Sequence, residues 1–263
     1  VPLIASSIMS KKLASGAQGI VLDIKTGDGA LMHTLQDSIR LGEAMVDIGY
    51  QAGRRVSAFV TGMEEPLGSH VGNALEVKEA IDILAGRTEG PLLEVSLILG
   101  AEMLVLGGVA NDANQARELL LGAVESGAGL NKLKEMVEAQ GGDGRVTEDT
   151  GLLPRAAHII PVHAGGWVQR MDALHIGTIA QGLGAGRVHK DDVIDPAVGV
   201  VLHVRIGDKA EPGMMLAHIH ANDPKKGEDA AAALLGAIHL GAEHAPKAKI
   251  LHAVISKDCT EEL

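Results

Sequence analysis

Two side chains near the start of the chain, Ser7 and Lys11, have the types and the spacing to bind a small polar ring. They lie four residues apart in a segment, Pro2 to Ala14, whose apolar residues recur at roughly helical spacing, so both point from the same face of a helix. A hydroxyl and an ammonium group directed at one spot suit a heterocycle that carries carbonyl acceptors and an N–H. The alternative is that Lys11 and Lys12 form a solvated surface pair, which is the commoner case for charged helix faces.

Other polar groups have commoner structural explanations. His218 and His220 would share one face of a strand and could bind a metal, but no third ligand follows at a plausible spacing. The glycines of 182–186 have the wrong spacing for a dinucleotide loop, and no acidic residue that could bind ribose follows them. The aspartates of 191–195 form an acidic loop that we expect to be solvated.

The composition narrows the class of protein. A hydrophobic content of 46% in 263 residues is that of a folded chain rather than a disordered one. The net charge of -11 and an aromatic set limited to Tyr50, Phe59 and Trp167 argue against binding to nucleic acid, which needs basic patches and stacking platforms. Cys259 is the only cysteine and no apolar run is long enough to span a membrane, so we expect a cytoplasmic protein.

The pattern of elements in the first half predicts an α/β fold. Gly19 to Gly27 and Arg55 to Thr61 are expected to be strands, and Thr34 to Ala52 a helix between them. This alternation predicts βαβ units and a largely parallel or mixed sheet. Further helices are expected at 73–84, 91–107, 111–126 and 130–139.

A glycine- and acid-rich stretch without periodicity, 139–154, predicts a domain boundary, and the chain beyond it is expected to be rich in strands. Within that part, Gly207 to Lys209 and Glu211 to Gly213 resemble half of the barrel of biotinyl and lipoyl carrier domains. The lysine that a carrier presents at a hairpin tip, typically flanked by methionine, has no counterpart. We therefore do not expect carrier activity, although a carrier-like domain joined to an α/β unit stays a third hypothesis.

Three blocks of sequence resemble the pyrimidine-nucleoside phosphorylase and thymidine phosphorylase family in their order and spacing. They are PLIASSIMSKK (2–12), GIVLDIKTGDGALM (19–32) and PLGSHVGNALEVKEAI (66–81). The resemblance continues into the C-terminal region and covers essentially the whole chain. It implies the remnant of a helical domain at 1–15, an α/β catalytic region at 16–153 and a C-terminal domain of the α/β hammerhead or barrel-sandwich type at 154–263.

The resemblance also implies roles for particular residues. The family catalyses reversible phosphorolysis of pyrimidine nucleosides such as uridine and thymidine, with inorganic phosphate as co-substrate. Ser7 and Lys11 would bind the base, and Lys11 would stabilise the charge that grows on the base as it leaves. Bacterial members bind a potassium ion, whose ligands here would be the main-chain carbonyls of Leu67 and His70 and the side chain of Glu79.

The family's phosphate loop has no counterpart within 1–263, and the chain begins at Val1 inside a segment expected to be structured. We therefore expect an incomplete chain whose phosphate site lies upstream, with little or no activity by itself. The rival hypothesis is a catalytically inactive fragment or a binding module. The complete protein is expected to be a homodimer that associates through its helical domain, so loss of that domain would expose Ile4 and Ile8.

Overall fold

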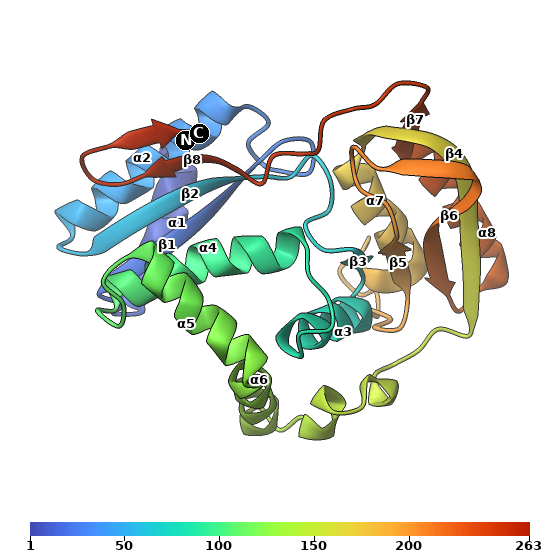
Figure 1. Ribbon diagram of the computed structural model, residues 1–263, viewed down its shortest axis with the longest axis horizontal. Helices are drawn as coiled ribbons and strands as arrows, with labels where there is room; N and C mark the ends of the chain where they lie inside the picture. Colours follow the sequence, from blue (N-terminus) through green and yellow to red (C-terminus); the bar gives the residue numbers. More distant parts are fainter. The chain divides into compact units, whose positions relative to one another are not determined.

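Two separate sheets, each with its own helices, make up the fold of residues 1–263, all of which the computed structural model describes (Figure 1). Unit 1 consists of Val1–Met63, Pro91–Gly122 and Lys249–Leu263, and unit 2 consists of Glu64–Gly90 and Ala123–Ala248. None of the helices is both long and apolar enough to cross a lipid bilayer.

The elements of unit 1, in chain order, are α1 (Pro2–Ala14), β1 (Gly19–Thr26), α2 (Leu35–Gln51), β2 (Arg55–Gly62), α4 (Pro91–Leu106), α5 (Ala113–Glu125, whose last turn passes into unit 2), β8 (Leu251–Ile255) and β9 (Thr260–Glu262). The helical elements of unit 2 are α3 (Asn73–Leu84), α6 (Ala128–Ala139), η1 (Gly144–Thr147), η2 (Thr150–Leu152), α7 (Ala173–Ala180), η3 (Gln181–Ala185) and α8 (Pro224–Ala237). Its strands are β3 (His70–Val71), β4 (His158–Met171), β5 (Gly199–Leu202), β6 (Lys209–Ala221) and β7 (Ile238–Gly241).

The sheet of unit 1 has the order β1-β2-β8-β9 and is mixed. Strands β1 and β2 are parallel, because α2 carries the chain back between them, whereas β8 runs antiparallel to β2. Alternate residues of β1, Ile20 and Leu22 among them, are buried under α2. On the other face, the Ser57 hydroxyl of β2 donates a hydrogen bond of 2.5 Å to Glu102 of α4. Helices α2 and α4 therefore cover opposite faces of this sheet (Figure 1).

Close packing of α2 depends on two of its glycines. A Cβ atom at Gly42 would lie 2.4 Å from Ile255, and one at Gly49 would lie 2.1 Å from Val56, both closer than real contacts allow. These residues lie seven positions apart, which places them on the same side of the helix. The absent side chains allow the helix backbone to approach the sheet.

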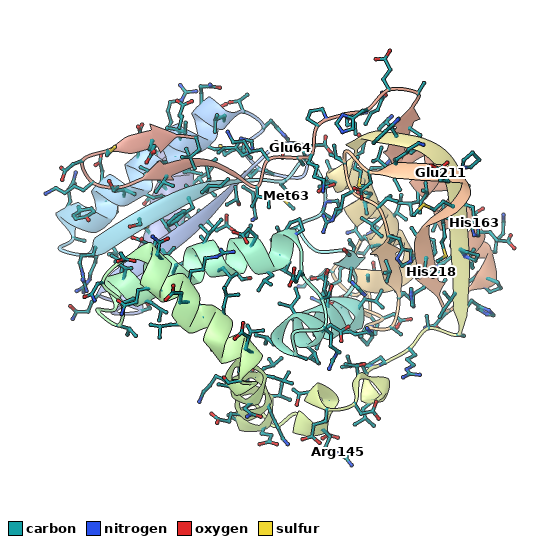
Figure 2. All side chains as sticks on the ribbon, viewed as in Figure 1. Met63, Glu64, Arg145, His163, Glu211 and His218 are labelled. Carbon is teal, nitrogen blue, oxygen red and sulfur yellow. The ribbon has the colours of Figure 1, made fainter.

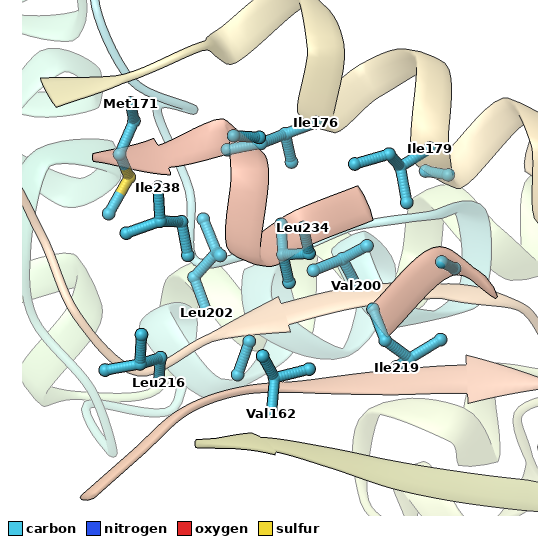
Figure 3. Packing of buried hydrophobic residues seen from close by; sticks show 14 of the residues in the cluster. Val162, Met171, Ile176, Ile179, Val200, Leu202, Leu216, Ile219, Leu234 and Ile238 are labelled. Atoms are coloured by element: carbon cyan, nitrogen blue, oxygen red, sulfur yellow. The ribbon is translucent and has the colours of Figure 1, made fainter. Parts of the chain in front are cut away.

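The sheet of unit 2 has the order β3-β5-β6-β4-β7, and every pair of neighbouring strands in it is antiparallel. Helices α7 and α8 bury an aliphatic core against it, in which Leu216, Ile219 and Leu234 are fully buried (Figure 3). The core contains no aromatic side chain, in agreement with the low aromatic content of the chain.

The predicted α/β class is confirmed, and so are the parallel strand pair and the predicted helices of the first half, to within a few residues at their ends. The part after 154 is rich in strands as expected, and it also contains α7 and α8, which the sequence analysis did not predict. The barrel-sandwich form of this region stays a prediction. The two units are a different division of the chain from the predicted domains 1–15, 16–153 and 154–263, and those boundaries also stay a prediction.

Candidate functional site

The exposed face of α1 carries both residues expected to bind the base. Ala5 and Met9 are fully buried on the other side of the helix, and Met9 packs toward Gly49 of α2. Ser7 and Lys11 are exposed on the same helix, four residues apart. Packing of the buried side therefore fixes the direction in which the hydroxyl and the ammonium group point.

The Ser7 hydroxyl and the Lys11 ammonium are not bound by any other part of the chain. No carboxylate lies within ion-pair distance of the Lys11 ammonium, and the Ser7 hydroxyl has no hydrogen-bond partner. The Ser10 hydroxyl donates to the main-chain oxygen of Ser7 at 3.1 Å, which leaves the Ser7 side chain free. Both groups are available to a ligand, although their roles in binding and catalysis stay predictions.

A network that the sequence analysis did not anticipate lies near the carboxyl ends of β1 and β2, also in unit 1. The Lys25 ammonium donates to the Thr61 hydroxyl at 2.8 Å and lies 2.8 Å from the Asp23 carboxylate, to which Thr61 donates in turn. Carboxyl ends of parallel strands are where open α/β sheets bind ligands. The available signal was the alternation of Asp23 and Lys25 with buried apolar residues, which places both on one face of the strand.

In unit 2, the segment that contains Leu67 and His70 folds around the side chain of Glu79 on α3. Glu79 is buried, and its carboxylate accepts hydrogen bonds from the amides of Ser69 at 2.6 Å and His70 at 3.1 Å. The His70 imidazole nitrogen Nδ1 lies 3.6 Å from the same carboxylate and is buried without a hydrogen-bond partner. The family resemblance implies that Leu67, His70 and Glu79 lie together, and Glu79 does contact this segment.

Opposing effects act on the ionisation of Glu79. Burial by itself would raise the pKa of this carboxyl, but attraction by the His70 ring and hydrogen bonds from the Ser69 and His70 amides outweigh it and hold the pKa below its usual value. Glu79 is therefore a carboxylate at neutral pH, and it carries a negative charge that a cation would complement.

Arg205, which the sequence analysis did not single out, fixes the start of the same segment. Its guanidinium donates to the main-chain oxygens of Pro66 and Leu67, the second at 2.7 Å, and lies 3.4 Å from the Glu65 carboxylate. Burial raises the pKa of the Glu65 carboxyl, against the lowering effect of the Ile206 amide, which donates to it at 2.8 Å, and of Arg205. No sequence signal pairs residues 138 positions apart in the chain.

These groups fit a potassium ion in their chemistry. Main-chain carbonyls and a carboxylate are oxygen donors, which a hard cation prefers. The Leu67 carbonyl keeps one lone pair after accepting from Arg205, and the Glu79 carboxylate supplies the charge. The unpartnered nitrogen of His70 is not a ligand of the type that such an ion selects.

Histidines collect on one face of the sheet in unit 2. His218 and His220 point away from the buried Ile219, as their spacing predicted, and His218 lies on β6 opposite β4, which carries His163 (Figure 2). His203 Nε2 is 2.8 Å from His218 Nδ1, so one ring donates a hydrogen bond to the other. No group of three or more histidine, cysteine, aspartate or glutamate residues is placed to hold a metal ion.

Two family models match the chain. The model described as "Glycosyl transferase family, a/b domain" matches residues 1–130, and "Pyrimidine nucleoside phosphorylase C-terminal domain" matches residues 167–241. The chain is 45% identical over 259 residues, 98% of its length, to a pyrimidine-nucleoside phosphorylase of Staphylococcus aureus (strain bovine RF122 / ET3-1). This chain belongs to the pyrimidine-nucleoside phosphorylase family. A second such phosphorylase, from Staphylococcus aureus (strain MSSA476), is 45% identical over 257 residues, which is 97% of this chain.

The chain spans 59% of the length of these curated relatives. All five predicted site residues, from Ser7 to Glu79, lie within the segment that matches the glycosyl transferase model. Lys25 and Thr61 of the network on β1 and β2 lie within it as well.

Proposed function

We propose that this chain provides the base-binding side of an enzyme that cleaves pyrimidine nucleosides, uridine and thymidine, by phosphorolysis in nucleoside salvage. The observation that carries the proposal is the exposed face of α1, where an unpaired ammonium and an unpaired hydroxyl lie four residues apart in a family-matched segment. Inorganic phosphate is the proposed co-substrate, and the products are the free base and a pentose 1-phosphate.

In the proposed reaction, phosphate oxygen forms a bond to the anomeric carbon of the pentose while the bond from that carbon to the base nitrogen breaks. The electron pair of the broken bond passes to the base, so negative charge grows on the ring in the transition state. The Lys11 ammonium would stabilise that charge, and the Ser7 hydroxyl would orient the ring by a hydrogen bond. Since no carboxylate neutralises Lys11, its full charge is available for this task.

A potassium ion is the proposed resident cation of unit 2, held by the carbonyls of Leu67 and His70 and by the carboxylate of Glu79. Its role would be to fix the 67–70 segment and α3 relative to one another. We also propose that the complete protein is a cytoplasmic homodimer. The single cysteine agrees with a reducing compartment, and the exposed Leu3 of α1 offers apolar surface to a partner.

The rival function is that of a binding module or an inactive fragment, which would keep the base-binding face without the chemistry. Two preparations distinguish these functions: the 263-residue chain, and a fusion that adds the residues of the Staphylococcus aureus relative outside the matched region. Each is incubated with phosphate and either thymidine or uridine, and release of the free base is followed.

We expect turnover by the fusion with at least one of the two nucleosides, and little or none by the chain alone. Robust turnover by the chain alone would exclude the inactive-fragment hypothesis and show that no added segment is needed. A correctly folded fusion that releases no base from either nucleoside would contradict the proposed function.

A further inference from the structure

A cavity of about 260 Å³ lies entirely within unit 2, between the first turns of α3, the segment that follows η2, and strand β6. None of the residues proposed to bind base or potassium lines it. Its wall is mostly aliphatic, with Leu75, Leu153 and Ile159 as the largest apolar side chains. A volume of this size admits a molecule of about ten non-hydrogen atoms, somewhat below the range of typical drug-binding pockets.

All the charged side chains that line the cavity are basic. They are Lys78 and Arg155, accompanied by His220, and no carboxylate belongs to the wall. This is unexpected in a chain with 34 acidic and 23 basic residues. Lys78 is paired with Asp82 at 2.6 Å, one turn further along α3 and outside the wall, so its charge is partly neutralised.

Arg155 is not paired in this way, although the Asp149 carboxylate lies near it on the other side of Gly151. Its guanidinium makes no ion pair and no side-chain hydrogen bond within the chain, whereas most other arginines contact a carboxylate or a main-chain oxygen. A planar guanidinium matches a carboxylate through two parallel hydrogen bonds. In the same cavity wall, the half-buried His220 stays neutral at pH 7, because burial and the nearby His218 and His70 lower its pKa. It can therefore add a hydrogen bond without adding charge.

We propose that this cavity is a binding site for a small organic monocarboxylate with an apolar body. The carboxylate would pair with Arg155 at the rim, and the body would lie against Leu75, Leu153 and Ile159. Inorganic phosphate fits less well, since an aliphatic wall cannot replace the water that a multiply charged anion loses. The site does not depend on the proposed phosphorolysis, because its residues are separate from those of the base site.

The test uses the full 263-residue chain and benzoate as the probe, with benzamide as a neutral probe of the same shape. Binding is followed by amide shifts in ¹H–¹⁵N NMR spectra. We expect benzoate to bind with Kd of about 1 mM or tighter, with shifts concentrated at Leu75, Leu153 and their neighbours. Benzamide and inorganic phosphate should bind at least about tenfold more weakly, because the first lacks the charge and the second the apolar body.

Two variants and a control locate the site. Arg155→Gln should weaken benzoate binding about tenfold or more, and Ala156→Phe, which fills the cavity, should abolish it. The matched control is Arg145→Gln, at an exposed arginine on η1 that is paired with Asp143 and does not line the cavity (Figure 2); it should change Kd less than twofold.

The proposal is overturned if benzoate causes no localised shifts at tens of millimolar. It is also overturned if Arg155→Gln and Arg145→Gln weaken binding equally, or if benzamide or phosphate binds as tightly as benzoate. Thermal unfolding of each variant reports whether it is folded, and Arg155→Gln, which alters an exposed side chain, keeps the test decisive if Ala156→Phe does not fold.

Discussion

The Nη2 atom of Arg205 lies 2.7 Å from the carbonyl oxygen of Leu67, so a fixed positive charge already contacts one of the oxygens expected to bind potassium. The same guanidinium contacts Pro66 and Glu65, the two residues that directly precede Leu67 in the chain. Arg205 thus holds the backbone that would present the Leu67 carbonyl to a cation. Any cation bound there would share this oxygen with the arginine.

Arg205→Ala should destabilise unit 2 by about 2 kcal/mol or more, because it leaves the largely buried Glu65 carboxylate without its cation. Side chains of both partners are less than one-fifth exposed, at 19% and 11%, so water compensates little. Urea unfolding measures the change. The control is Arg87→Ala, which breaks an ion pair with Asp82 from a side chain that is half exposed and should cost less than about 1 kcal/mol. Equal losses of unfolding free energy in the two variants would mean that the contacts of Arg205 stabilise unit 2 no more than an exposed ion pair does.

The depressed pKa of His220 predicts a stability that depends on pH. Burial, followed by repulsion from His218 and His70, lowers the pKa of His220 below its ordinary value of 6.5, so the unfolded chain binds a proton more readily than the folded one. The free energy of unfolding should therefore be at its full value above pH 6.5 and fall as the pH decreases toward the lowered pKa.

The variant His220→Gln checks this assignment. Urea unfolding at several pH values between 7.5 and 5, spanning the ordinary histidine pKa, should give a smaller loss of stability on acidification than in the unchanged chain. A loss of the same size in both proteins would assign the effect to other groups, of which His203, whose pKa is also lowered by burial, is one.

The space around two helix glycines, Gly49 of α2 and Gly122 of α5, predicts opposite effects for their replacement by alanine. Gly49→Ala should destabilise unit 1 by about 1–3 kcal/mol, because the new methyl group meets Val56 at 2.1 Å. Gly122→Ala, in α5, places a methyl group with nothing within 4 Å and should stabilise the helix by about 0.5–1 kcal/mol. Thermal unfolding distinguishes the two. Similar small effects at both positions would mean that α2 does not pack as tightly as the structure indicates.

Local patterns explain how much of the fold followed from the sequence. Helix α1 and strands β1 and β2 have clear apolar periodicity and have proline or glycine at their ends. For this reason α1 and the parallel strand pair could be predicted. Helix α8 was not predicted, although Asp223 caps it by accepting from the Lys225 amide at 2.8 Å and Pro224 begins it. Its many alanines and glycines give the helix only a weak amphipathic pattern. Because strands precede and follow it, that weak pattern was not recognised as a helix.

The residues of the candidate site also fall into those that could be predicted from the sequence and those that could not. Ser7 and Lys11 were predictable because they lie on one helix, where spacing alone determines the face. Arg205 contacts Leu67 across 138 positions, and Lys25 contacts Thr61 across 36, through pairings that only the sheets establish. Such contacts have no local signal in a single sequence, whatever the residue types involved.

Ser7→Ala, made in the fusion described above, should raise KM for the nucleoside by about two- to tenfold, the loss expected for one hydrogen bond to a neutral group. The effect on kcat should be smaller, because the hydroxyl orients the ring in both the ground state and the transition state. Ser6→Ala is the matched control, since Ser6 is also exposed on α1 but points 100° away around the helix. KM is measured by steady-state kinetics. Equal KM values for the two variants would contradict the assignment of Ser7 to base binding.

The most direct test of the account is the effect of Lys11→Gln on kcat/KM for thymidine phosphorolysis in the same fusion. Lys12→Gln, at the adjacent exposed lysine, removes the same charge one position along α1 and serves as the control. The account predicts that Lys11→Gln lowers kcat/KM about 100-fold or more, as for loss of a group that stabilises developing charge, and that Lys12→Gln changes it less than twofold. Equal and small effects of the two changes, with both variants folded, would contradict the assignment of Lys11 to the departing base.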